Sequence, residues 1–271
     1  MCTTLDELAA CSDAIYIASP NSLHCVQSRF FLERGIPVLC EKPLGSNEKE
    51  IVSMLESAKR NNVAFAEAYK SKWMPAYRLM REWMPQIGRI RNARFDFCKY
   101  STRYDAHLRG EDVNTFRAEF SNGALLDLGV YCLYPALELF GEPKSVTGSG
   151  ILVPGGVDGL GSAILTYDDF LVTLNYSKVS EGARGAEIQG EKGTIFVDAI
   201  SSPRKVDLVL LSGEREVFSP ETAEEDMLYE CDAFADLMMC GGIQDEERIL
   251  TAFRILDQLR AQVGIVYPAD Q

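Results

Sequence analysis

The chain has 271 residues, 46% of them hydrophobic, and a formal net charge of −13. This composition is typical of a globular protein with a substantial core. No cluster of more than three Lys or Arg residues occurs, which argues against nucleic acid as a partner. An apolar run of 18 residues and a signal peptide are also lacking, so we expect a cytoplasmic location and no membrane partner.

The first 86 residues alternate short apolar strands with amphipathic helices. We expect strands at 14–18, 37–40 and 63–67, and helices at 22–34, 48–61 and 75–84. Ser22 is expected to cap the first helix, and Ser46 or Asn47 the second. Such alternation predicts a parallel sheet with crossover helices. Residues 1–86 are therefore interpreted as a partial dinucleotide-binding (Rossmann) domain.

A glycine-rich phosphate loop is missing from this partial domain. No GxGxxG motif precedes the strand at 14–18, and residues 1–13 are too short for the strand–loop–helix–strand unit, which needs about 30 residues. Because helix-start amides at such a loop hold the cofactor pyrophosphate, we expect this polypeptide to bind NAD(P) weakly or not at all.

The pattern changes after Gly88. We expect a long strand at 91–100, a helix at 124–140, further strands at 144–151, 161–167, 170–178, 184–190, 193–198 and 205–211, and final helices at 223–240 and 245–262. Residues 87–271 are thus predicted to form an α+β domain with a large, mostly antiparallel open sheet and helices on one face. The other face, for which Ile164, Thr166, Val172, Leu174 and Tyr176 are available, is expected to pair subunits in a homo-oligomer.

Glu41, Lys42 and Pro43 directly follow a buried strand. Ligands of parallel sheets bind beyond the carboxyl ends of the strands. A lysine beside a bound nicotinamide can donate a proton or polarise a substrate carbonyl oxygen. The alternative is a solvated Glu-Lys pair ahead of a turn.

Asp127 and Tyr131 are four positions apart in a largely apolar predicted helix, which places them on one face. A carboxylate and a phenol on a buried helix need partners, and Lys42 could supply one. We expect the three side chains to meet in one cleft and to pass a proton to or from a substrate oxygen. The alternative is a core hydrogen bond between the aspartate and the tyrosine.

Four stretches together carry a family resemblance: SPNSLH at 19–24, EKPLG at 41–45, LLDLGVY at 125–131 and RILDQLRAQVGIVYP at 254–268. In order and spacing the chain resembles the Gfo/Idh/MocA oxidoreductases over essentially its whole length. Many members have His where this chain has Tyr131, and the tyrosine resembles the glucose–fructose oxidoreductase and dihydrodiol dehydrogenase branch.

The resemblance implies roles for individual residues. The catalytic residues would be Lys42, Asp127 and Tyr131. The residues binding NAD or NADP, which the sequence does not distinguish, would be Ser19, Pro20, Asn21, His24, Glu41, Lys42 and Pro43. Glu67 matches a family glutamate of less certain role. No metal ligand is implied, and the two histidines and eight cysteines, none in CxxC spacing, indicate neither a zinc site nor a disulfide framework.

The implied activity is hydride transfer between nicotinamide and a small carbohydrate-like substrate, that is, a sugar, polyol or cyclic alcohol or diol. The alternative is an inactive or regulatory homologue that cannot bind dinucleotide because the phosphate loop is missing.

Overall fold

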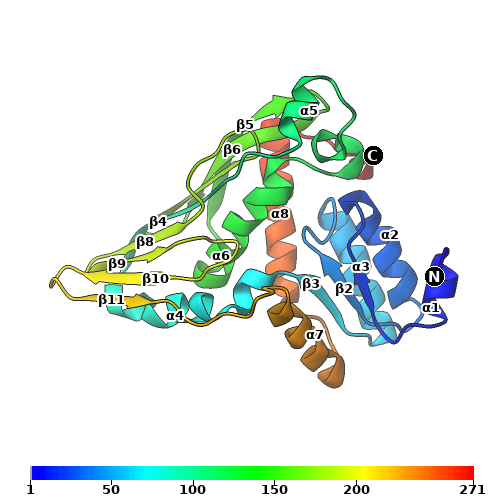
Figure 1. Ribbon diagram of the computed structural model, residues 1–271, viewed down its shortest axis with the longest axis horizontal. Coiled ribbons are helices and arrows are strands. Elements are labelled where there is room, and N and C mark those ends of the chain that lie inside the picture. Colours follow the sequence, from blue (N-terminus) through cyan, green and yellow to red (C-terminus); the bar gives the residue numbers. More distant parts are fainter. Residues whose placement is uncertain (1) are drawn as a thin grey trace.

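The computed structural model describes residues 2–271 and contains two sheets with helices between them (Figure 1). The first sheet has three parallel strands in the order β1-β2-β3. Its elements, with the short helix that precedes them, are α1 (Leu5–Ala9), β1 (Ile15–Ile17), α2 (Asn21–Leu32), β2 (Val38–Glu41), α3 (Glu48–Asn61) and β3 (Phe65–Ala68). This arrangement confirms the predicted parallel sheet with crossover helices.

The two main helices of this part differ at their first residues: a side chain caps the start of α3, but none caps the start of α2. The Asn47 side chain accepts the N–H of Glu50 and caps α3, which spans the predicted residues. Helix α2 starts after Pro20, without a side-chain cap. The prediction of Ser22 as the cap was wrong, because Ser22 already lies within the first turn.

The second sheet has eight strands in the order β11-β10-β9-β8-β4-β7-β6-β5. Its strands are β4 (Ile90–Cys98), β5 (Ser145–Val153), β6 (Val157–Thr166), β7 (Leu171–Ser177), β8 (Ala186–Gly190), β9 (Gly193–Val197), β10 (Val206–Leu210) and β11 (Arg215–Phe218). All pairs are antiparallel except β4 with β7, which confirms the mostly antiparallel prediction. Strand β11 was missed because all four of its residues are exposed and show no buried alternation.

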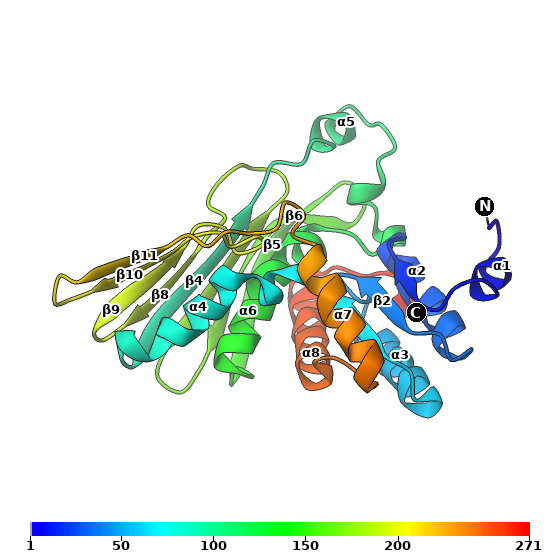
Figure 2. The same cartoon turned by 60° about the horizontal axis from the view of Figure 1, so that its bottom comes forward.

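Helices lie on one face of the large sheet, and the opposite face is uncovered (Figure 2). These helices are α4 (Pro75–Trp83), α6 (Val130–Phe140) and α8 (Glu246–Val263). Helix α5 (Tyr104–Leu108) stands in the long connection after β4, and α7 (Leu228–Cys240) begins later than predicted. The assignment of Val172, Leu174 and Tyr176 to the uncovered face was wrong. All three are buried beneath the helices, and the alternation of the strand turns their neighbours Thr173 and Asn175 outward.

Helix α7 packs on the first sheet although it follows the second in sequence. Phe234 joins a small apolar cluster with Leu39, Ala66 and Ala68 of the three-stranded sheet. A further bridge pairs Phe65 with Ile243. The boundary between 1–86 and 87–271 therefore remains a prediction, since the late helix is shared between the two parts.

The predicted helix at 124–140 consists of two consecutive segments with different helical geometry. Leu125–Gly129 is a π-helical segment, and α6 continues it as an α-helix. By length and composition the segment Ala118–Phe140 could cross a membrane, but 72% of its most apolar window is buried inside the structure. Burial of this kind is typical of a core helix. The segment carries both predicted catalytic residues of the second part.

Candidate active site

Lys42 joins the two sheets at the carboxyl end of β2. Its Nζ donates hydrogen bonds to Oδ1 of Asp127 at 2.8 Å and to the main-chain oxygen of Asp127 at 2.9 Å. The Lys42–Pro43 peptide bond is cis. The structure thus excludes a solvated Glu-Lys pair, because only 13% of the Lys42 side chain is exposed.

The π-helical segment positions Asp127. π-Helical turns are rare and occur frequently at functional sites. The segment begins at Leu125, whose N–H is bound by Oδ2 of Asp158 at 2.8 Å. Gly123 makes this approach possible, since a Cβ there would lie 2.2 Å from the other Asp158 oxygen. The Asp158 carboxylate, which extends from β6, therefore fixes the start of the turn that carries Asp127.

A second lysine completes the cluster. Lys178 follows β7, is 4% exposed, and places its Nζ 2.7 Å from Oδ2 of Asp127. Burial would raise the pKa of Asp127, but the charges of Lys42 and Lys178 outweigh it and hold that pKa well below its usual range. Burial would lower the pKa of Lys42, but Asp127 outweighs it and the pKa is raised. Asp127 and Lys42 are therefore both charged at neutral pH.

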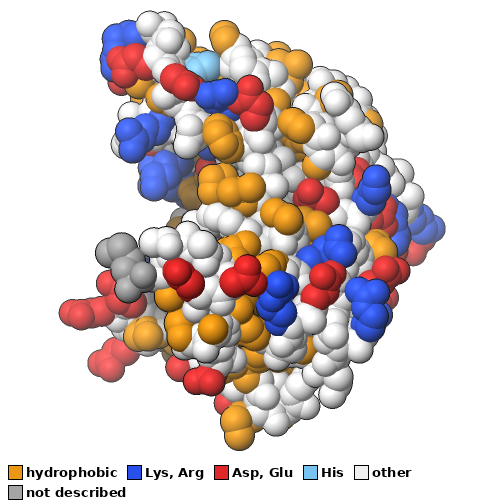
Figure 3. Space-filling model, turned by 90° about the vertical axis from the view of Figure 1, so that its right-hand side faces the viewer, with side chains coloured by type: hydrophobic (Ala, Val, Ile, Leu, Met, Phe, Trp, Pro, Cys, Tyr) orange, Lys and Arg blue, Asp and Glu red, His pale blue; other side chains and the backbone are white. Residues whose placement is uncertain are grey.

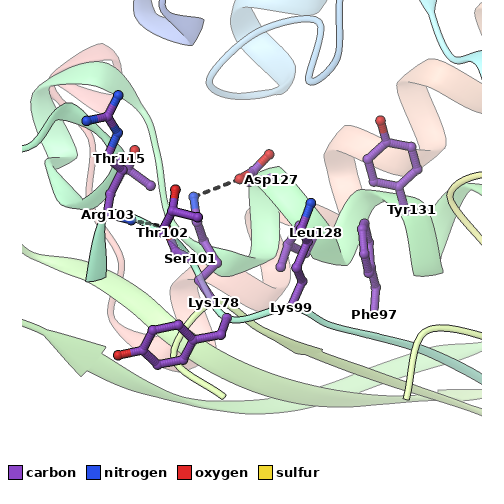
Figure 4. Close-up of a pocket in the computed structure, with 11 residues that line it drawn as sticks. Phe97, Lys99, Ser101, Thr102, Arg103, Thr115, Asp127, Leu128, Tyr131 and Lys178 are labelled. Carbon is purple, nitrogen blue, oxygen red and sulfur yellow. Dashed lines mark hydrogen bonds and ion pairs between the residues drawn. The ribbon is translucent and has the colours of Figure 1, made fainter. Parts of the chain in front are cut away.

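Tyr131 lies beside this cluster, with its ring centroid 4.7 Å from Nζ of Lys42. Phe97 packs edge-on against the ring at a centroid distance of 5.5 Å, and Tyr69 lies 6.4 Å away. Among residues 2–271 no group is hydrogen-bonded to the Tyr131 hydroxyl, which points into the cavity (Figure 4). Burial raises the pKa of Tyr131, and the charge of Lys42 opposes that increase.

A cavity of about 410 Å³ opens over these residues. It is within the size range of small-molecule sites. The residues that line it come from β4, the connection after β4, the π-helical turn, α6 and the end of β7: Phe97, Lys99, Tyr100, Ser101, Thr102, Arg103, Thr115, Asp127, Leu128, Tyr131 and Lys178. Asp127 and Tyr131 thus line one cavity, and Lys42, which is not part of the lining, contacts both.

The residues expected to bind the cofactor gather at the ends of β1 and β2. Ser19, Pro20 and Asn21 link β1 to α2, and the first amides of α2 have no side-chain cap. Uncapped helix-start amides are suited to a ribose or phosphate oxygen. At the end of β2, Glu41 accepts a hydrogen bond from Tyr16. These strand ends remain the predicted site for the nicotinamide half of a dinucleotide.

His24 and Pro43 lie beneath these strand ends. His24 has no exposed surface, and its ring nitrogens lie 2.9 Å from the main-chain oxygens of Pro43 and Ser19. This burial contradicts the expectation that His24 contacts the cofactor. Pro43 is also buried. Both residues instead hold the β1 and β2 ends together.

A cradle for the pyrophosphate is not found in residues 2–271. The start of α3 is the other helix N-terminus near these strand ends, but protein groups already occupy its amides. The N–H groups of Ser46, Glu48 and Glu50 are bound by Glu50, Asp257 and Asn47 respectively, at 2.7, 2.9 and 2.9 Å. The amides at the start of α3 are therefore not free to bind a phosphate of the cofactor.

Glu67 has a positioning role that the sequence did not define. Its carboxylate is fully buried in β3 and accepts the N–H of Leu44 at 3.0 Å, two residues after Lys42. It also binds the Tyr134 hydroxyl at 2.6 Å and Arg248 at 3.1 Å. A buried carboxylate with three donors is well satisfied. Glu67 therefore anchors the Lys42 turn to α6 and α8.

Asp158 makes the stability of the protein depend on pH. Burial raises its pKa to about 6 from an ordinary value of 3.8, although the Leu125 amide opposes this increase. Between these values the native state holds a proton that the unfolded chain has lost, so stability falls as pH rises through this window. Asp158→Asn cannot titrate at this position. When the pH is raised from about 5 to about 7, we therefore expect its free energy of unfolding to increase by about 1–2 kcal/mol relative to that of the unsubstituted protein.

Urea unfolding at the two pH values measures this difference. Asp13→Asn, at an exposed position, is the matched control and should follow the unsubstituted protein at both pH values. An Asp158→Asn variant whose relative stability is the same at both would contradict the assignment.

Comparisons with known proteins agree with this architecture. Residues 1–69 match the family described as "Oxidoreductase family, NAD-binding Rossmann fold", and residues 77–196 match the "GFO/IDH/MocA C-terminal domain". The N-terminal region is thus an NAD-binding Rossmann region, and the chain is an oxidoreductase of a family whose members use NAD or NADP.

Three similar proteins illustrate the relationship. The NADP-dependent scyllo-inositol 2-dehydrogenase IolU of Bacillus subtilis is 44% identical over 98% of this chain and 83% of its own length. Mouse trans-1,2-dihydrobenzene-1,2-diol dehydrogenase is 29% identical over 96% of this chain and 80% of its own. The 3-ketoreductase KijD10 of Actinomadura kijaniata has a similar fold, with a TM-score of 0.82 at 21% identity over 95% of this chain and 81% of its own. The chain therefore belongs to the Gfo/Idh/MocA family of oxidoreductases.

Proposed function

We propose that this protein oxidises a secondary hydroxyl of a cyclic polyol or sugar, or reduces the matching ketone, with NADP or NAD. The observation that carries the proposal is the free Tyr131 hydroxyl, which points into a cavity beside the Lys42–Asp127 ion pair. Bound nicotinamide supplies the hydride acceptor or donor. Scyllo-inositol and dihydrobenzenediol, the substrates in the relatives' names, support a ring that carries hydroxyl groups.

Each polar side chain has a part in this proposal. In the oxidation direction the Tyr131 phenolate takes the proton of the substrate hydroxyl, and in reduction the phenol returns it. The positive charge of Lys42 favours the phenolate and the negative charge that develops on the substrate oxygen. Asp127 holds Lys42 in place from one side and is itself held by Lys178.

The proposal is tested with scyllo-inositol and trans-1,2-dihydrobenzene-1,2-diol, each with NADP⁺ and NAD⁺. We expect reduction of the dinucleotide at high concentration, with a dissociation constant above about 1 mM for the 271-residue chain, because the described residues contain no glycine-rich loop and the amides at the start of α3 are already bound. Titration of nicotinamide fluorescence with NADPH measures the affinity. Micromolar affinity would contradict the expected weak binding.

The same assay distinguishes the alternative. An inactive or regulatory homologue would leave both polyols unchanged at every dinucleotide concentration, although it could still bind them. Such a result would overturn the proposed enzyme and favour the alternative.

We also propose that the uncovered face of the eight-stranded sheet pairs two copies of the chain. Ile164 and Leu171 are 44% and 46% exposed on neighbouring strands of that face. Exposed apolar surface on an open sheet is typical of subunit contacts. The mass of the protein measured by light scattering tests this pairing.

A further inference from the structure

The cavity over Tyr131 contains two cations without a partner. Lys99 and Arg103 both line it, and within residues 2–271 neither forms an ion pair. Other arginines on the same connection are paired: Arg109 lies 2.7 Å from Glu111, and Arg117 lies 2.7 Å from Asp112. The two cavity cations therefore differ from their neighbours in having no carboxylate.

The remaining charges of the site do not offset these cations. Asp127 is the single acidic residue that lines the cavity, and Lys42 and Lys178 both bind it. The lining thus holds three cations, Lys99, Arg103 and Lys178, and one carboxylate, in a protein whose formal net charge is −13. A positive cavity in a negative protein attracts anions locally.

The cationic side chains of the cavity are placed where they can contact a bound ligand. Lys99 and Lys178 directly follow β4 and β7, and Arg103 lies on the connection after β4; in Figure 4 all three point to the same side as the Tyr131 hydroxyl. The face that contains the notch between the two parts of the molecule carries Lys and Arg on its upper rim and Asp and Glu on its lower rim (Figure 3). A molecule in the cavity therefore meets cations and hydroxyl donors on the sheet side.

We propose that the substrate carries an anionic group, a carboxylate or a phosphate, in addition to its reacting hydroxyl, and that Arg103 and Lys99 bind it. The guanidinium group of arginine matches the paired oxygens of either anion. Ser101, Thr102 and Thr115 offer hydroxyl groups beside these cations. This inference rests on the proposed function and narrows its substrate class, cyclic polyols and sugars, to members that also carry a carboxylate or a phosphate.

Calorimetric titration with D-glucose, D-glucuronate and D-glucose 6-phosphate, with and without NADP⁺, tests the proposal. These sugars share a ring and differ in charge at one carbon. We expect at least one of the two anions to bind about 10–100-fold more tightly than glucose, as is typical of a charged hydrogen bond. Their relative affinities separate a carboxylate site from a phosphate site.

Variants then assign the effect. Arg103→Met and Lys99→Met should each remove most of the preference for the anion and leave glucose binding unchanged. Arg109→Met removes the same charge from the same connection, outside the cavity, and is the matched control. If the two cations instead serve a phosphate of the cofactor, the variants will weaken NADPH binding and leave the preference among sugars unchanged.

Several results would overturn the proposal. They are equal binding of glucose and both anions, no measurable binding of any of them, or an unchanged preference in Arg103→Met. Failure of the proposed function would give a different result. Anion-selective binding without reduction of the dinucleotide would support the anion site and contradict the proposed dehydrogenase activity.

Discussion

Lys42→Met should lower turnover by roughly 10³-fold or more, about 4 kcal/mol in the activation barrier. Methionine keeps most of the length of the side chain but donates no hydrogen bond, so both contacts to Asp127 are lost. Burial already raises the pKa of Tyr131, and the charge of Lys42 opposes this increase. Without that charge the pKa of the phenol rises further, and less phenolate is available to take the substrate proton.

The expected change is mainly in kcat, because Lys42 acts on charge that develops during the reaction. Steady-state assays with scyllo-inositol measure it, and NADPH titration checks that the cofactor affinity changes little by comparison. Lys49→Met, at an exposed position of α3, is the control and should keep normal turnover. Turnover of Lys42→Met within a few-fold of the control would remove Lys42 from the mechanism.

Much of the site was predictable because it lies where regular elements end. The apolar run before Glu41 placed Lys42 at the carboxyl end of a parallel strand, where ligands bind. The four-residue spacing of Asp127 and Tyr131 predicted a shared face. Their meeting with Lys42 across 85 residues followed from the need of a buried carboxylate for a partner.

Other parts depend on tertiary contacts that spacing does not reveal. Lys178 follows a strand that resembles any half-buried strand, and only the sheet order brings it to Asp127. Alternation shows that one face of β7 is apolar, but not whether helices or a second subunit cover that face. Helix α6 packs on β7, and Leu174 has no exposed surface. The π-helical form of the segment depends on the Asp158 contact from β6.

The roles of Gly129 and Tyr176 show the same limit. A glycine within a helix allows a close approach of another part of the chain. In the structure Gly129 meets the ring of Tyr176, which a Cβ would approach to 3.1 Å. The same ring leaves no room for a side chain at Gly161, where a Cβ would lie 2.5 Å from its hydroxyl. Two glycines and one aromatic residue thus set the distance between the π-helical turn and the sheet.

Tyr131→Phe removes the phenolic proton, keeps the ring against Phe97, and should lower turnover by about 10²–10⁴-fold. Dinucleotide affinity should remain nearly unchanged, because the predicted cofactor contacts lie at the ends of β1 and β2. The fold should also be retained, since the lost hydroxyl has no hydrogen bond within residues 2–271.

The pH dependence of the same variant separates an acid–base role from a packing role. Because the pKa of Tyr131 lies above its ordinary value, oxidation by the unsubstituted protein should accelerate as pH rises through the neutral and alkaline range. The residual oxidation by Tyr131→Phe should lose this slope. Tyr77→Phe, on a buried tyrosine of α4 outside the cavity lining, should retain it. Near-normal turnover with an unchanged slope in Tyr131→Phe would show that another group takes the substrate proton and that Tyr131 only lines the cavity.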